Sequence, residues 1–252
     1  MISHIPIYIL MVDKLNWSQD LLCDQFFSIK KEKMTKEEKN ILLREKLIQM
    51  KKYENELYEK GLTYIGGVDE VGRGPLAGPV VTACVVLPKD FDILGVDDSK
   101  KLSEKKRKEL YDIILSKAIA YGIGLVDNKI IDEINILEAT KVAMAMSIDN
   151  CNKMLEKLNL GHMEHVLIDA VRLDGIPCDQ TNIIKGDASS VSIAAASIIA
   201  KVTRDRMMIE YSKIYPYYSF EKNKGYGTKA HYEGIDKMGI TPIHRKSFLK
   251  GK

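Results

Sequence analysis

Three separate apolar stretches of the sequence each lead into a carboxylate. Asp69 and Glu70 follow YIGGV, Asp169 ends HVLID, and Asp187 lies in IIKGDASS, where a strand passes into a helix. Taken alone, each acid fits a turn former or a helix cap. Because the strands of an open α/β sheet end where loops converge, the acids can also meet in one site. Side chains alternate along a strand, so we expect the glycine turn after Glu70 to bend the chain and bring both acids to one face.

Carboxylates that converge in a buried place raise one another's pKa unless cations lie among them. Hard divalent cations prefer oxygen ligands, so the acids predict a Mg²⁺ or Mn²⁺ site. Zinc is disfavoured, because the sequence has no cluster of histidine or cysteine beside them. The four cysteines form no CxxC pair, which is typical of reduced thiols in a cytosolic protein.

A glycine-rich turn, GRGPLAG, separates the first acids from the next apolar run. The glycine loops that bind dinucleotides or nucleoside triphosphates open a helix, whereas β-branched VVTACVV follows here. Pro75 also lacks the N–H that a phosphate cradle uses. A nucleotide-cofactor module is therefore disfavoured. Two interpretations stay open: a plain turn between strands, or a turn where the backbone approaches a substrate closely and Arg73 binds a phosphate.

Positive charge gathers in the last fifth of the chain. Residues 201–252 contain 12 Lys and Arg against 5 Asp and Glu, although the whole chain carries a net charge of only +3. This asymmetry favours contacts with phosphates, but an ordinary solvated basic surface explains it as well.

Strands and helices alternate along the body of the chain. Apolar or β-branched runs predict strands at 63–69, 79–87, 119–126, 165–170 and 181–185. Helical spacing predicts helices at 103–118, 135–160, 189–215 and 228–239. This alternation indicates an α/β fold with helices layered on a central sheet.

The first 60 residues differ from this body. Residues 16–61 contain no proline and show apolar residues at helical spacing, Thr35 and Glu38 fit a capping box, and Gly61 suits a helix end. We therefore expect an N-terminal helical extension at 1–60 and a catalytic domain at 61–252. The apolar stretch HIPIYILMV is too short to span a membrane, and we expect neither an anchor nor an export signal.

Several blocks, in order along most of the chain, resemble bacterial ribonuclease HII, the type 2 ribonuclease H family. They are GVDEVGRGPLAGPVV (67–81), DDSKKLSEKKR (97–107), EINILEAT (133–140), VLIDA (166–170), KGDASSVSIAAASIIAKVTRD (185–205) and KGYGTKAHYE (224–233). The resemblance implies a ribonuclease H-like fold: a mixed central β-sheet flanked by helices, with a helical C-terminal part that helps grip the duplex.

The resemblance also implies the reaction. The expected enzyme is a metal-dependent endonuclease that cuts the RNA strand of RNA–DNA hybrids and incises duplex DNA on the 5′ side of single embedded ribonucleotides. It would leave a 3′-hydroxyl and a 5′-phosphate and use two ions, Mg²⁺ or Mn²⁺. Catalysis and metal binding are implied for Asp69, Glu70, Asp169 and Asp187.

Residues that bind the substrate carry over in the same way. Gly72, Arg73 and Gly74 match the turn that reads the ribose 2′-hydroxyl, and Tyr226 matches the tyrosine that stacks on the sugar at the DNA–RNA junction. Phosphate contacts or support of the active site are implied for Lys100, Lys101, Lys201 and Arg204.

Two positions depart from a common family pattern: Ala170 and Gly227 stand where many members have glycine and proline, and neither change removes a functional group. We expect a cytoplasmic monomer whose partners are RNA–DNA hybrids and DNA containing ribonucleotides, with no membrane; protein partners stay open. The alternatives are a ribonuclease H that requires runs of ribonucleotides and a non-catalytic nucleic-acid-binding module.

Overall fold

The computed structural model describes residues 34–249, and the chain divides into two compact units, Met1–Asn40 and Ile41–Lys252. In the first unit the description begins just before helix α2 (Lys36–Met50). The Thr35 N–H donates to Glu38 Oε2 at 2.7 Å, and the Glu38 N–H donates to Thr35 Oγ1 at 3.2 Å. This reciprocal pair confirms the predicted capping box. The part of the predicted helical extension before residue 34 lies outside the described residues.

A five-stranded mixed sheet forms the centre of the second unit, in the order β3-β2-β1-β4-β5. The strands are β1 (Ile65–Val71), β2 (Val80–Val86), β3 (Ala120–Val126), β4 (His165–Asp169) and β5 (Asp179–Ile183). Strands β1, β2 and β3 pair antiparallel, whereas β4 runs parallel to both β1 and β5. This mixed sheet confirms the predicted fold class.

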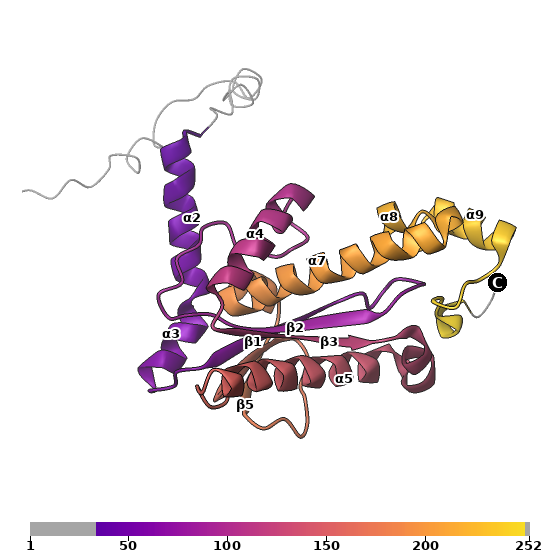
Figure 1. The fold of residues 1–252 in the computed structure, drawn as a ribbon. Helices are drawn as coiled ribbons and strands as arrows, with labels where there is room; N and C mark the ends of the chain where they lie inside the picture. Colours follow the sequence, from indigo (N-terminus) through magenta and orange to yellow (C-terminus); the bar gives the residue numbers. More distant parts are fainter. Residues whose placement is uncertain (1–33, 250–252) are drawn as a thin grey trace, which may run out of the picture. The chain divides into compact units, whose positions relative to one another are not determined.

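Helices cover both faces of the sheet (Figure 1). Helices α4 (Glu104–Lys117) and α7 (Val191–Ile214) lie on one face, and α5 (Asn128–Lys157) lies on the other. Helix α5 begins earlier than the predicted residue 135, because Asp127 caps an additional segment by accepting two backbone N–H bonds at 3.0 Å. A kink at Asn135, where φ is 69°, separates this segment from the predicted helix.

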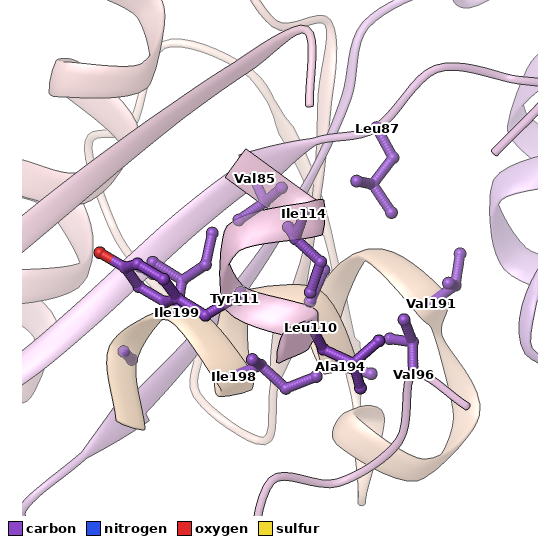
Figure 2. Packing of buried hydrophobic residues seen from close by; sticks show 14 of the residues in the cluster. Val85, Leu87, Val96, Leu110, Tyr111, Ile114, Val191, Ala194, Ile198 and Ile199 are labelled. Atoms are coloured by element: carbon purple, nitrogen blue, oxygen red, sulfur yellow. The ribbon is translucent and has the colours of Figure 1, made fainter. Parts of the chain in front are cut away.

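Small side chains allow α7 to pack closely on the sheet. Ala194, Ala195 and Ala196 are fully buried, and a Cβ added at Gly67 of β1 would lie 2.1 Å from the Ser192 carbonyl carbon. Larger apolar side chains from α4, α7 and β2 fill the space beside this contact, as Figure 2 shows for Leu110, Ile114, Ile198 and Val85. The close approach fixes α7 against the strand that carries Asp69 and Glu70.

The domain boundary predicted at residues 60/61 stays a prediction, whereas the compact unit that contains the sheet begins at Ile41. Met50 of α2 and Leu57 of α3 (Lys52–Glu59) are buried in it. Glu54 accepts hydrogen bonds from the Ser190 hydroxyl at 2.6 Å and the Ser192 N–H at 3.0 Å. Residues 41–60 are therefore part of the same core as the sheet.

Short elements complete the chain: α6 (Gly186–Ser189), η1 (Pro216–Tyr218), α8 (Phe220–Asn223), α9 (Lys229–Met238) and η2 (Lys246–Phe248). Helix α8 lies at the C-terminal end of α7 (Figure 1). There, Tyr218 and Phe220 stack with their ring centroids 5.3 Å apart in a small apolar cluster. Within residues 34–249, no helix is both long and apolar enough to cross a membrane.

Candidate active site

Asp69 and Glu70 lie inside β1, which continues to Val71, rather than at its end. They pair across the antiparallel ladder with Ala83 and Thr82. The expected bend at the glycine turn therefore comes too late to bring them to one face. Asp69 is buried, with 4% of its surface exposed, whereas Glu70 is half-buried. The two acids occupy different environments on one strand.

Burial and neighbouring acids act on Asp69 in the same direction. Desolvation raises its pKa well above the ordinary value, and the charges of Glu70 and Asp169 raise it further. A hydrogen bond with the Ser197 hydroxyl of α7 opposes this shift only in part. An ionised Asp69 is therefore unfavourable until a cation compensates its charge.

Glu70 responds to the same group of charges and to a nearby arginine. Burial is the largest cause that raises its pKa, and Asp169 adds to it. Arg73 lowers the pKa in opposition, with Nη1 3.6 Å from Glu70 Oε1. Glu70 thus links the acids to the glycine turn.

Asp169 comes beside these acids through the parallel pairing of β4 with β1, in which Ile168 lies opposite Val68. Its Oδ1 accepts the N–H of Gly186 at 2.8 Å. That bond joins the end of β4 to α6, the helix that carries Asp187.

Asp187 meets a carboxylate that the sequence interpretation missed. Burial raises the pKa of Asp187, and Asp98 and Asp169 raise it further, partly through a hydrogen bond between the Asp98 and Asp187 side chains. Lys100 opposes the shift. Asp98 belongs to DDSKKLSEKKR, a block for which the sequence interpretation assigned roles only to lysines. The two adjacent acids at its start are the signal that could have identified Asp98.

The four predicted basic residues have different surroundings. Asp69, Asp98, Asp187 and Glu70 together raise the pKa of Lys100 against the opposing effect of burial, which is the largest single cause. Lys101 instead pairs with Asp97 at 3.8 Å, and Lys201 pairs with Asp205 at 2.7 Å. Of these three lysines, Lys100 is the one whose charge interacts with the acids.

Arg204 binds backbone carbonyl oxygens in the interior of the protein. Its side chain is fully buried and donates to the carbonyl oxygens of Pro79 at 2.9 Å, Lys224 at 2.8 Å and Ala77 at 3.1 Å. Because the Arg204 side chain is buried, these bonds favour the second of its two predicted roles, support of the active site, over a direct phosphate contact.

The glycine turn and Tyr226 are neighbours. A Cβ added at Gly74 would lie 3.5 Å from Tyr226 Cε1, so the aromatic ring borders the turn. Arg73 and Gly74 are exposed, and Tyr226 is 45% exposed. Gly72, with φ of +97°, adopts a backbone conformation that favours glycine. Arg73, Gly74 and Tyr226 form an exposed surface next to the buried Gly72, and the ion pair of Arg73 with Glu70 connects this surface to the acids.

The chemistry of the four predicted acids fits a hard divalent cation, since they supply oxygen ligands with an excess of negative charge. Within residues 34–249, however, no three Asp, Glu, His or Cys side chains form a ready-made metal-binding group. The acids therefore interact electrostatically without closing into a compact ligand shell.

Comparisons with known proteins identify the family. The Ribonuclease HII family model matches residues 66–250. The chain is 57% identical over 206 residues to Ribonuclease HII of Clostridioides difficile (strain 630), covering 82% of this chain and 78% of the relative. It is 59% identical over 205 residues to Ribonuclease HII of Bacillus cereus (strain Q1), covering 81% and 76%.

Solved structures agree with this assignment. Ribonuclease H2 from Pyrococcus horikoshii OT3 matches with a TM-score of 0.58 at 25% identity, covering 75% of this chain and 100% of that chain. The RNase HII of a PCNA complex from Archaeoglobus fulgidus matches with a TM-score of 0.58 at 27% identity, covering 75% and 95%. The chain therefore belongs to the ribonuclease HII family, which makes it a ribonuclease H and a hydrolase.

Proposed function

We propose that this protein cuts the RNA strand of RNA–DNA hybrids and incises duplex DNA on the 5′ side of a single embedded ribonucleotide, leaving a 3′-hydroxyl and a 5′-phosphate. The observation that carries the proposal is the pairing of β4, which ends at Asp169, with β1, which carries Asp69 and Glu70. Family membership supports the hydrolytic chemistry, and the coupled acids support its dependence on a divalent cation.

Mg²⁺ or Mn²⁺ would be held by Asp69, Glu70, Asp169 and Asp187, whose carboxylates suit hard cations. When bound, a divalent cation supplies Lewis acidity at the phosphate and lowers the pKa of the attacking water. Lys100, whose charge already interacts with these acids, offsets part of their mutual repulsion and orients toward the substrate phosphate.

Recognition of the ribose falls to the exposed surface beside the acids. Gly72, Arg73 and Gly74 approach the sugar through their backbone, and the 2′-hydroxyl is the group that distinguishes RNA from DNA. The exposed Arg73 side chain binds a phosphate oxygen. Tyr226 stacks on the sugar at the junction, a role supported by the contact between its ring and Gly74. Lys101 is also exposed and adds a contact with a phosphate of the substrate. Lys201, which pairs with Asp205, supports the site.

Three labelled duplexes test this function: all DNA, DNA with one ribonucleotide, and a long RNA–DNA hybrid. Each is incubated with Mg²⁺, Mn²⁺ or chelator. We expect incision on the 5′ side of the single ribonucleotide and cleavage of the hybrid, both lost in chelator, with the all-DNA duplex intact. Cleavage of the long hybrid alone would contradict the roles of the glycine turn and Tyr226. No cleavage with either cation would leave a binding module.

A further inference from the structure

Two fully buried arginines lie beneath the glycine turn. Arg204 comes from α7, and Arg245 precedes η2. Within residues 34–249 neither has a carboxylate within 4.0 Å, the distance of an ion pair. Both instead donate to backbone carbonyl oxygens, so each buried charge is compensated by peptide dipoles.

Arg245 contacts the turn itself. Its Nη2 donates to the Gly72 carbonyl oxygen at 2.6 Å, its Nη1 to that of Arg73 at 2.9 Å, and its Nε to that of Gly78 at 2.9 Å. Arg204 holds the carbonyls of Ala77 and Pro79 in the same loop. The loop therefore directs five carbonyl oxygens at two guanidinium groups.

Both guanidinium groups stay cationic at neutral pH. Burial, aided by the charge of Arg204, lowers the pKa of Arg245 to about 9, and burial lowers the pKa of Arg204 to about 10. Hydrogen bonds from a charged donor are about twice as strong as those between neutral groups. Burying two like charges lowers the stability of the fold. Stability therefore does not explain why both arginines lie beneath the turn.

Glycines make this contact possible. A Cβ added at Gly72 would lie 2.2 Å from Arg204 Nε, and one at Gly78 would lie 3.4 Å from Arg204 Nη2. Both glycines also have positive φ, +97° and +85°. The glycine content of the turn thus allows the buried arginines to pack directly beneath its backbone.

The opposite side of the same peptide groups is free for a ligand. In a trans peptide the C=O of one residue and the N–H of the next point in opposite directions. Because the carbonyls of Gly72 and Arg73 point at Arg245, the N–H groups of Arg73 and Gly74 point away from it. Within residues 34–249, these two N–H groups have no hydrogen-bond partner.

We propose that Arg245, supported by Arg204, is a positioning residue for ribonucleotide recognition. It fixes the carbonyls of Gly72 and Arg73 and thereby holds the N–H groups of Arg73 and Gly74 ready for the ribose 2′-hydroxyl. This inference rests on the proposed function, because it assigns a cause to the geometry of the turn that reads the ribose.

Arg245→Lys tests the inference, since lysine keeps the charge but cannot span three carbonyls. Affinity is measured by fluorescence anisotropy with Ca²⁺ for two duplexes that differ only in one ribo- or deoxyribonucleotide. We expect the ribonucleotide preference to fall about fivefold to tenfold, as for loss of one hydrogen bond between neutral groups. Arg206→Lys, an exposed change on the same helix α7, should keep the full preference.

The ratio of the two affinities separates positioning from stability. Partial unfolding lowers the active fraction for both duplexes equally and leaves the ratio unchanged. An unchanged ratio in Arg245→Lys would therefore overturn the inference while the proposed function stands. A wild-type protein without any ribonucleotide preference would overturn both.

A measurement on the wild-type protein covers the case in which Arg245→Lys fails to fold. Backbone ¹⁵N relaxation of the free protein should give order parameters near 0.85 for the N–H groups of Arg73 and Gly74, as in rigid backbone. Values below about 0.6 would mean a flexible turn and would overturn the inference.

Discussion

The Nε2 atoms of His231 and His244 lie 3.0 Å apart in the buried core below Tyr226. His231 Nδ1 lies 2.9 Å from the Tyr226 carbonyl oxygen, so this nitrogen carries the proton and donates. The Thr241 N–H donates to His244 Nδ1 at 2.8 Å, which leaves the His244 proton on Nε2. His244 therefore donates to His231, and both rings are neutral.

The histidine pair should make stability fall in acid. Burial lowers the pKa of His244 to about 4 and also lowers that of His231, from an ordinary 6.5. Because the unfolded chain binds these protons more readily, their contribution is complete above pH 6.5 and is lost as the pH falls toward 4. We therefore expect the melting temperature to fall less steeply with decreasing pH in His244→Gln than in the wild type, which thermal melts across this pH range measure.

The exposed His162 provides the control for this slope. Its side chain is 66% exposed, near Glu156, and His162→Gln should keep the wild-type pH dependence. Parallel slopes for the wild type and His244→Gln would contradict the assignment of two buried neutral rings.

Asp69→Asn should abolish cleavage and stabilise the metal-free protein. Burial raises the pKa of Asp69, so at neutral pH its ionised form costs folding free energy that asparagine does not. We expect a gain of at least about 1 kcal/mol, or about 2–4 °C in melting temperature for a chain of this size. Calorimetry in EDTA measures it, with the exposed Asp112→Asn as control.

Added Mg²⁺ should raise the melting temperature of the wild type more than that of Asp69→Asn, because a cation that binds the folded state stabilises it more when it binds more tightly. If the Asp69→Asn protein is folded and cleaves at the wild-type rate, Asp69 has no part in the proposed mechanism.

Tyr226→Ala should reduce the preference for a single ribonucleotide over a long hybrid by about tenfold, the effect of losing one stacking contact. The ratio of kcat/KM on the two substrates measures this preference. Tyr226→Phe should retain most of the wild-type preference. Tyr217→Ala is the matched control, because that tyrosine is also half-exposed, at 54%, and lies in η1. Equal ratios for Tyr226→Ala and the wild type would place the stacking contact elsewhere.

Ala170→Gly should stabilise the protein. Ala170 has φ of 54°, which costs an alanine about 1–2 kcal/mol, and glycine avoids this at an entropic cost of about 0.4–1 kcal/mol in the unfolded chain. We expect a net gain of about 0.5–1 kcal/mol in urea unfolding. Ala145→Gly, at an exposed position of α5, should instead lose about 1 kcal/mol. A loss at both positions would mean that Ala170 is not strained.

Local signals in the sequence determined most of the secondary structure. Thr35 and Glu38 form the predicted capping box, and Ser103 caps the helix predicted to begin there, because a capping bond needs only residues within one turn. The apolar runs became strands β1 to β4 for a similar reason: alternation and β-branching are properties of a short segment. The acids at or near their ends were therefore identifiable without tertiary information.

Tertiary structure alone decided what surrounds those residues. Arg204 resembles a phosphate-binding arginine in sequence, yet its partners Ala77, Pro79 and Lys224 are distant in the chain and reach it through packing. The partnership of Asp98 with Asp187 likewise joins a loop to helix α6. Residues 41–60 belong to the core because Met50 and Leu57 find apolar partners there. A linear pattern carries local preference, whereas burial and pKa depend on which distant groups the fold brings together.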